Sequence, residues 1–297
     1  MEKYVSVHGG HSGQFCLHAA DSLEDIIRQY IALGFSWVGI TEHMPPVNDT
    51  FRYPDEVEAG LSAQRLFSRF LDYTAECRRL KEKYASRITL LMGVETETCP
   101  GYFPFVSKLI NQCRPDYIVG SVHHVNGLCF DFSKAHYERA AAAAGGIDAM
   151  YCDYFDLQHE MISLLEPAVV GHFDLVRLFD PHYKTRIQQR EIQDRIARNL
   201  ALIGRKNLVM DFNLRALLKG ADEPYISKEI LRQAKALDIP VVPGDDSHGV
   251  DNIGQNMDRG IAILKHHGFD TCWQRPMLSP SPTHVYEHVL KKNRNSV

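Results

Sequence analysis

The stretch Tyr4-Val-Ser-Val-His8-Gly-Gly-His11 joins a short apolar run to two histidines that are separated by two glycines. Glycine permits sharp backbone turns, so both imidazoles can face one point just beyond the run. An apolar run followed by a histidine or a carboxylate recurs five more times along the chain. Side chains so far apart in sequence converge only if the fold brings one end of every strand together. A parallel β/α barrel does this, and its active site lies at the carboxyl ends of the strands.

Nine residues share this placement, and they carry imidazole or carboxylate groups but no thiolate. In chain order they are His8, His11, His18, His43, Glu95, His123, His172, Asp246 and His248. Such donors suit zinc, iron, manganese and similar divalent cations. One histidine among the 15 in the chain is more often an ordinary surface or core residue, so it is the repetition that indicates a metal site. Glu97 and Asp245 are alternative carboxylates beside Glu95 and Asp246.

Seven short runs read as strands that are apolar on both faces, as expected for parallel strands covered by helices. They cover residues 4–8, 37–41, 88–94, 117–121, 168–171, 208–212 and 239–243. Asp21-Ser-Leu-Glu24 reads as a capping box that starts the first helix, and Gly34 as its C-terminal cap.

Further helices are predicted at residues 62–84, 148–165, 185–203, 227–237 and 255–267, and a long irregular loop at 44–60. No linker or internal repeat is visible. We therefore predict a single α/β domain over residues 1–297, a distorted barrel with seven strands instead of the usual eight.

The composition excludes several classes of protein. With 44% hydrophobic and 24% charged residues and a net charge of −4, the chain has no basic face for a nucleic acid. The seven cysteines are scattered without a Cys-x-x-Cys pair, which argues against a thiolate zinc site or a disulfide framework. No run approaches the ~18 apolar residues of a membrane span. We expect a cytoplasmic protein with a small-molecule substrate, and the sequence does not indicate its oligomeric state.

The motifs, taken in order, resemble the PHP superfamily, named after polymerase and histidinol phosphatase. They are His-x-x-His-Ser-Gly, Thr-Glu-His, Gly-x-Glu, Ser-Val-His, Gly-His-Phe-Asp-Leu and Asp-Ser-His. The resemblance covers nearly the whole chain and is closest to the histidinol-phosphate phosphatases, with support from Phe15-Cys-Leu-His18 and Pro224-Tyr-Ile-Ser-Lys228. It implies a (β/α)7 barrel, two or three divalent metal ions, and hydrolysis of L-histidinol phosphate in histidine biosynthesis. Zinc is the first expectation for the metal, with manganese or iron as alternatives.

The resemblance also implies how the metal ligands are shared. It places His8, His11, Glu95 and Asp246 around one metal, His18, His43 and His248 around a second, and His123 and His172 around a third that Glu95 bridges. The family usually has His-x-His in the first motif, so the expected ligand falls here on Gly9. We expect His8 to reach the metal through a bulged turn; otherwise the first metal has one ligand fewer.

The expected chemistry is attack of a metal-bound hydroxide on phosphorus, with Glu95 bridging the cations and Asp246 or His248 assisting proton transfer. A guanidinium group suits the phosphate, and Arg177 and Arg215 are the best-placed arginines. Asn213 is expected to hydrogen-bond the substrate. In the family the arginine that follows this asparagine comes later, near Leu218-Lys219.

Three other functions remain open from the sequence. A phosphoesterase for another small ester or a nucleotide would have nearly the same metal site. An amidohydrolase would need a bridging lysine or glutamate and an eighth strand, and no lysine stands at a predicted strand end. A barrel that binds metal only for structure is the third alternative.

Overall fold

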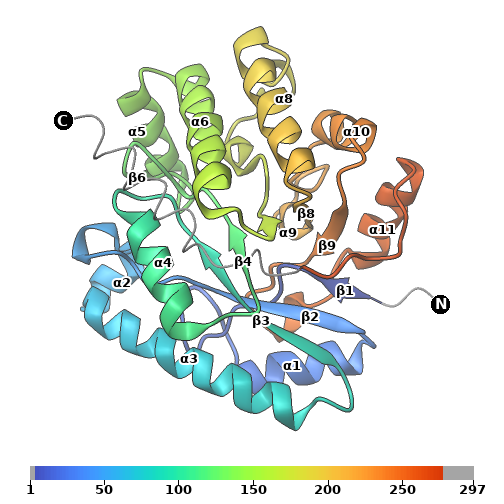
Figure 1. Ribbon diagram of the computed structural model, residues 1–297. Helices are drawn as coiled ribbons and strands as arrows, with labels where there is room; N and C mark the ends of the chain where they lie inside the picture. The colour runs from blue at the N-terminus through green and yellow to red at the C-terminus, as the bar shows by residue number, and fades with distance from the viewer. Residues whose placement is uncertain (1–3, 277–297) are drawn as a thin grey trace, which may run out of the picture.

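The centre of the molecule is a seven-stranded, wholly parallel sheet in the order β1-β2-β3-β4-β7-β8-β9 (Figure 1). The structure is a computed structural model that describes residues 4–276. The strands are β1 Val5–Ser6, β2 Trp37–His43, β3 Thr89–Thr96, β4 Tyr117–Gly120, β7 Val169–Val170, β8 Val209–Asn213 and β9 Val241–Gly244. Each of the seven runs predicted from the sequence overlaps one of them, and β2, β3, β8 and β9 extend one or two residues beyond the predicted ends.

Two backbone hydrogen bonds connect the first strand to the last. The Val7 N–H donates to the Pro243 carbonyl at 2.9 Å, and the Asp246 N–H donates to the His8 carbonyl at 2.8 Å. The sheet is therefore a seven-stranded, nearly closed barrel, as predicted. All seven strands run in the same direction, so their carboxyl ends form one rim.

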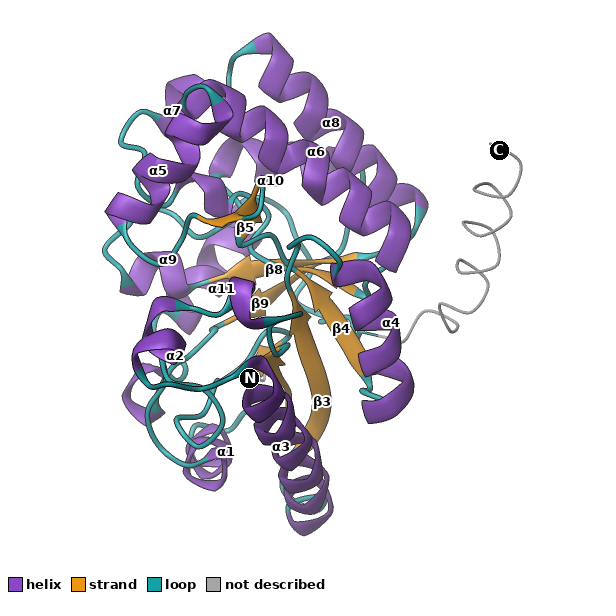
Figure 2. Cartoon of the chain, turned by 90° about the vertical axis from the view of Figure 1, so that its left-hand side faces the viewer, coloured by secondary structure: helices purple, strands orange, loops and turns teal. Residues whose placement is uncertain are grey.

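Helices surround this barrel on the outside, as the turned view shows (Figure 2). They are α1 Leu23–Ala32, α2 Pro54–Glu58, α3 Ala63–Lys83, α4 Tyr102–Cys113, α5 Lys134–Ala144, α6 Ile147–Leu165, α7 Tyr183–Arg186, α8 Arg190–Arg205, α9 Arg215–Leu218, α10 Lys228–Ala236 and α11 Met257–His266. Three single turns of 3₁₀ helix are η1 Asp49–Phe51, η2 Leu175–Arg177 and η3 Val250–Asn252. No helix among the described residues is sufficiently long and apolar to cross a membrane.

The first helix starts one residue later than the capping box predicted. The Ser22 hydroxyl accepts a hydrogen bond from the Asp25 N–H, so Ser22 is the N-cap and Asp21 lies outside the helix. Gly34 has a φ of 77°, and it follows the helix end as expected.

Other elements differ more from the prediction. The segment at 185–203 is broken into α7 and α8, and the loop at 44–60 contains η1 and α2. Helix α4 was not predicted, nor was the hairpin of β5 His124–Val125 and β6 Leu128–Cys129. Its two turn residues, Asn126 and Gly127, have φ values of 52° and 75°. Asn-Gly is the preferred pair for such a turn, so this hairpin was readable from the sequence.

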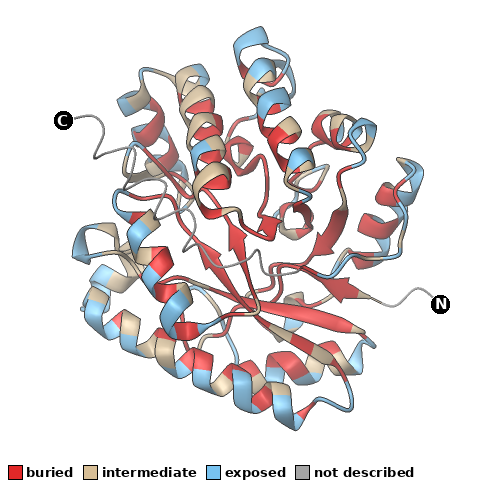
Figure 3. Cartoon of the chain, viewed as in Figure 1, coloured by how far each residue is buried: buried red, intermediate tan, exposed pale blue. Residues whose placement is uncertain are grey.

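Two hydrophobic clusters hold the layers together. The larger one lies between the strands and the helices, whose outward faces are exposed (Figure 3). The smaller one contains residues of the strands and their ends but none of the helices, and it fills the barrel interior. Its buried members are Val5, Val7, Trp37, Tyr117, Val119, Ala168, Val169, Val209 and Val242.

Tyr117 crosses this interior and ties two distant strands together. It is fully buried, and its hydroxyl donates to the Val7 carbonyl at 2.6 Å. A Cβ atom at Gly39 on β2 would overlap the Tyr117 hydroxyl, and one at Gly93 on β3 would lie 3.0 Å from the ring carbon that carries it. The two glycines thus make room for the tyrosine.

We expect Gly39→Ala to lower the free energy of unfolding by about 1–3 kcal/mol, because the new methyl group has no space in a packed interior. Urea unfolding followed by circular dichroism measures the change. Gly204→Ala is the control, since a Cβ at this position in α8 meets no atom closer than 3.6 Å. That change should raise the stability by about 0.5–1 kcal/mol, as alanine favours helix. Equal stability of the two variants would contradict the packing argument.

Candidate metal centre

The carboxyl rim of the barrel brings all nine predicted metal donors together. His43 ends β2, and Glu95 stands directly beside it in the register of β3. His123 and His172 follow β4 and β7 by one to three residues, and Asp246 follows β9. His8, His11 and His18 come from the segment after β1, and His248 from the segment after β9.

Glu95 lies at the centre of these donors, and each of its carboxylate oxygens faces a different group of imidazoles. Oε1 lies 2.9 Å from His172 Nε2 and 3.1 Å from His123 Nε2. Oε2 lies 3.2 Å from His8 Nε2 and 3.4 Å from His43 Nε2. A carboxylate placed in this way can bridge cations bound on its two sides.

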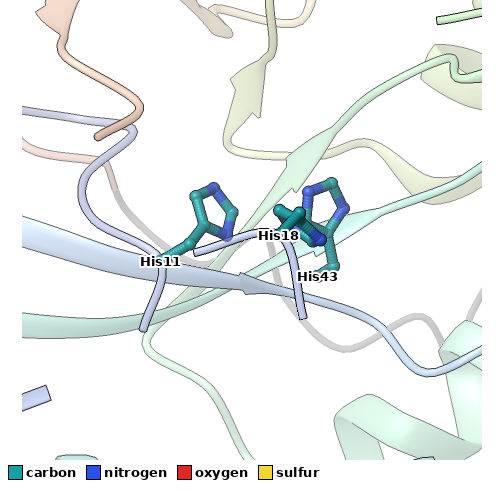
Figure 4. Close-up of side chains that lie close together, drawn as sticks. All are labelled: His11, His18 and His43. Carbon is teal, nitrogen blue, oxygen red and sulfur yellow. The ribbon is translucent and has the colours of Figure 1, made fainter. Parts of the chain in front are cut away.

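Three overlapping sets of donor atoms lie within 4.8 Å of one another, close enough to surround a metal ion. The sets are His11, His18 and His43; His8, His11 and Asp246; and His43, Glu95 and His123. Figure 4 shows the first set, whose ring centroids are 4.7 to 5.8 Å apart. The His248 ring lies 4.6 Å from that of His11. His11 and His43 each belong to two sets, so the three sets form one continuous cluster of donors.

Carboxylates behind the imidazoles orient them. Each carboxylate lies beside an imidazole Nδ1, which leaves Nε2 to face the centre. The pairs are His8 with Asp211 at 2.9 Å, His123 with Asp131 at 2.8 Å, and His11 with Glu42 at 3.2 Å. Such carboxylate–imidazole pairs are typical of metal sites, where they fix the tautomer and the ring orientation.

The electrostatics of the cluster fit a divalent cation. Nε2 of His8 and Nε2 of His11 are buried and form no hydrogen bond within the described residues. Burial opposes the charged form of Glu95, but the imidazoles of His8 and His43 outweigh it and hold the pKa of Glu95 well below its usual range. Burial lowers the pKa of His11, yet Asp246 and Glu42 raise it to about 9. Ionised carboxylates therefore face imidazoles that hold protons, and a divalent cation would replace these protons.

The doubled glycine of the first motif does not turn His8 away from the cluster. Gly9 donates its N–H to the Gly39 carbonyl at 2.9 Å, which extends the pairing of β1 with β2 by one step. A Cβ atom at Gly9 would overlap that carbonyl oxygen, so the close approach requires glycine. The backbone bends at Val7 and His8, and both imidazoles face Glu95 Oε2, with Nε2 of His8 at 3.2 Å and Nε2 of His11 at 3.9 Å.

The two alternative carboxylates lie outside this centre. Asp245 accepts hydrogen bonds from the hydroxyls of Ser6 at 2.5 Å and Tyr30 at 2.9 Å. Glu97 lies behind His43, on the Nδ1 side of the ring, 3.4 Å away. Asp245 therefore holds the hydroxyls of Ser6 and Tyr30, and Glu97 lies behind one of the metal donors.

A cavity of about 230 Å³ opens beside the donors. Its walls combine metal donors with an arginine and a lysine side chain, a further carboxylate and apolar side chains. They are formed by His18, His43, Tyr53, Glu95, His123, Asp131, Phe132, His172, Leu175, Arg215, Lys219, Tyr225, Asp246 and His248. Neither Arg215 nor Lys219 forms an ion pair with a carboxylate of the described residues.

The three expected substrate residues have different positions. Arg215 lines the cavity, and its Nη1 donates to the Asp246 carbonyl at 3.0 Å. Asn213 lies beneath it, where its Nδ2 donates to Asp246 Oδ2 and Asp211 Oδ2, both at 3.1 Å. It orients these carboxylates and does not line the cavity.

Arg177 does not line the cavity either. Its guanidinium is buried, pairs with Asp174 at 3.2 Å and donates to the carbonyls of Glu223 and Pro224. The rings of Tyr183 and Tyr225 lie on it, each with a centroid 4.7 Å away. The expected contact of Arg177 with phosphate is therefore not supported, because the side chain is fully engaged in joining loops.

Several residues of the site were missed from the sequence. Asp131 and Asp211 orient imidazoles, and Tyr53, Phe132 and Lys219 line the cavity. One signal existed for Lys219, which stands where the resemblance expects an arginine. Asp211 carried none, because its partner His8 is 203 positions away, whereas Asp131 follows His123 by only eight residues, across the Asn126-Gly127 turn.

Comparisons with known proteins agree with this geometry. Residues 9–215 match the model of the PHP domain family. A Schizosaccharomyces pombe protein named "Probable histidinol-phosphatase" is 35% identical over 268 residues, which cover 89% of this chain and 87% of that protein.

Two solved structures are similar as well. The "putative histidinol phosphatase" of Listeria monocytogenes has a TM-score of 0.76 and 27% identity, with 86% of this chain and 99% of that chain covered. The histidinol phosphate phosphatase of Lactococcus lactis, complexed with zinc, L-histidinol and phosphate, has a TM-score of 0.68 and 17% identity, with 91% and 95% covered.

We expect Glu95→Gln to lower the affinity for divalent metal by at least about 100-fold, more than the ~10- to 100-fold typical of an outer partner of a metal ligand. The variant keeps the side-chain shape but removes the charge that faces five imidazoles. Metal content per chain after dialysis against zinc, and competition with a chromogenic chelator, measure the effect. Glu76→Gln, at a carboxylate paired with Arg79 on the surface, is the control. Unchanged binding by Glu95→Gln would contradict the central role of this carboxylate.

Proposed function

Because the chain belongs to the PHP domain family, we propose that it is a metal-dependent phosphatase that hydrolyses L-histidinol phosphate to L-histidinol and phosphate. The observation that carries this proposal is the position of Arg215 and Lys219 in the cavity, on whose wall the metal donors also lie. Cationic side chains without carboxylate partners suit a phosphate group, and the donors suit the cations that activate its hydrolysis.

The relatives support the choice of substrate and metal. The S. pombe protein bears the name of this activity, and the L. lactis enzyme of the same fold was captured with zinc, L-histidinol and phosphate. We assign two or three divalent cations to the donor sets, with zinc as the first choice. In this assignment Glu95 bridges, and the remaining ligands are His8, His11, His18, His43, His123, His172, Asp246 and His248.

The bound cations would lower the pKa of water and neutralise charge on the phosphoryl oxygens. Side chains of the protein itself bind and orient the phosphate group. Arg215 and Lys219 bind phosphoryl oxygens and hold the phosphorus beside the donor cluster. Their positive charge stabilises the additional negative charge that these oxygens carry in the transition state.

Proton transfer falls to Asp246 or His248. Asn213 holds the Asp246 carboxylate at 3.1 Å, and the His248 Nδ1 lies 3.0 Å from the Asp246 carbonyl. Burial, aided by the charge of His11, lowers the pKa of His248 well below its usual range, so its imidazole is neutral, which is the form that binds a metal. Asn213 thus acts by positioning, in place of the substrate contact first expected.

The alternative functions receive less support. None of the described strands ends in a lysine that could form a bridging carbamate, which disfavours an amidohydrolase. A purely structural metal site would not need a cavity with two cations on its wall. A phosphatase for another small ester would share the metal site, so only a comparison of substrates distinguishes it.

We expect L-histidinol phosphate to be hydrolysed with a kcat/KM at least about 100-fold higher than unrelated esters, since discrimination by a few specific contacts amounts to several kcal/mol. Phosphate release by the zinc-, manganese- and iron-reconstituted protein, tested with a sugar phosphate, a nucleoside monophosphate and p-nitrophenyl phosphate, measures this ratio. Comparable kcat/KM values on several of these esters would contradict the assignment to histidinol phosphate.

Arg215→Ala and Lys219→Ala should each lower kcat/KM by about 10- to 100-fold, because a hydrogen bond to a charged group is worth ~1.5–3 kcal/mol. Lys219→Ala should leave the metal content unchanged, since Lys219 supplies no metal donor. Lys206→Ala, at a lysine that pairs with Glu166 away from the cavity, is the control. If Lys219→Ala kept full kcat/KM, this lysine would have no role in binding phosphate.

A further inference from the structure

Glu97 is a buried carboxylate that the mechanism above does not use. Its Oε1 lies 3.4 Å from His43 Nδ1, while the His43 Nε2 faces Glu95 Oε2, also at 3.4 Å. The two nitrogens are on opposite edges of one ring. A cation held by Nε2 is therefore beyond the reach of Glu97, which can act on it only through the imidazole.

A tyrosine hydroxyl holds this carboxylate in place. Tyr53 donates to Glu97 Oε1 at 3.0 Å. The other charged neighbours of Glu97 lie farther away, with His124 Nδ1 3.5 Å from Oε2. Among the described residues, Tyr53 thus provides the shortest side-chain hydrogen bond to Glu97.

The same tyrosine is part of the cavity wall. Its ring lines the cavity beside Phe132, with 6.4 Å between the ring centroids. Its backbone is anchored at the start of α2, where the Tyr53 N–H donates to Glu56 Oε2 at 2.8 Å. The ring of Tyr53 therefore faces the cavity, and its hydroxyl binds Glu97, the carboxylate beside His43.

We propose that Tyr53 is a positioning residue that acts through Glu97 on the imidazole of His43 and thereby tightens the metal bound at its Nε2. This inference rests on the proposed role of His43 as a metal ligand. The hydroxyl keeps Glu97 against Nδ1, so the proton of the ring stays on that nitrogen and the Nε2 lone pair points toward Glu95. The segment between β2 and α3 is thus tied to the metal centre by a hydrogen bond, although it supplies no ligand after His43.

The test compares metal affinity in five variants of the full chain: Tyr53→Phe, Glu97→Gln, the double variant that combines these two changes, Tyr151→Phe and His43→Ala. Tyr151 is the matched control, because its hydroxyl donates to the buried Asp180 carboxylate at 3.0 Å and neither residue lines the cavity. Zinc bound per chain and the dissociation constant of the weakest zinc, from competition with a chromogenic chelator, are the readouts.

Tyr53→Phe and Glu97→Gln should each weaken one zinc by about 10- to 100-fold, the usual effect of losing an outer hydrogen-bond partner. The double variant should bind zinc no more weakly than the weaker-binding of the two single variants, because both changes act through one path. Tyr151→Phe should stay within about twofold of the unmodified protein. A role of Tyr53 in folding alone would lower thermal stability and leave the affinity of the folded protein unchanged.

The outcomes separate this inference from the proposed function. If His43→Ala binds zinc as the unmodified protein does, the assignment of His43 as a ligand is wrong. If His43→Ala loses zinc while Tyr53→Phe and Glu97→Gln both keep their affinity within twofold, only the inference is wrong. Should Tyr53→Phe fail to fold, Glu97→Gln decides alone by the same criterion.

Discussion

The burial of the Glu95 carboxylate among imidazoles is the interaction on which the whole site depends. An ionised group removed from water costs several kcal/mol unless opposite charge and hydrogen-bond donors surround it. Here five imidazole Nε2 atoms lie within 3.9 Å of its two oxygens. They come from positions beyond β1, β2, β4 and β7, so no local segment could supply them. The nearly closed barrel is what makes this burial possible, because it brings the carboxyl ends of these strands to one place.

A second group of carboxylates lies behind the imidazoles that surround Glu95. An imidazole that binds a cation through Nε2 usually has a partner on its other nitrogen that fixes the ring. Asp211, Asp131 and Glu42 provide such partners at 2.8 to 3.2 Å. These carboxylates add negative charge to a region that already contains Glu95 and Asp246. The excess can be held together by protons on the imidazoles or by divalent cations. The barrel therefore gathers carboxylates and imidazoles at one rim, and their balance of charge favours a divalent cation.

The sequence predicted the barrel and the residues that meet at its carboxyl rim, because both depend on local patterns. A strand is visible as an apolar run, and a residue just after it must lie at the carboxyl rim. The outer carboxylates could not be found in this way. Asp211 orients His8, which is 203 positions away, and the pair exists only after the barrel has brought β8 near β1. The helix predicted at 185–203 is interrupted between Arg186 and Arg190, a break that no glycine or proline marks in the sequence. The Asn126-Gly127 hairpin, by contrast, carried a local signal that could have been used.

The different positions of Arg177 and Arg215 show why residue type and spacing alone do not predict which arginine faces the cavity. Arg177 follows a metal donor by five residues, yet its guanidinium has exchanged water for Asp174, two carbonyls and two aromatic faces. A guanidinium whose N–H groups already have partners gains little free energy by binding phosphate instead. Arg215 keeps most of its donors available while the Asp246 carbonyl holds one end of the fork. Lys219 adds a compact charge on a flexible stem. The cavity wall therefore combines a guanidinium that is held at one end with a lysine on a flexible stem, one at the start and the other at the C-cap of α9.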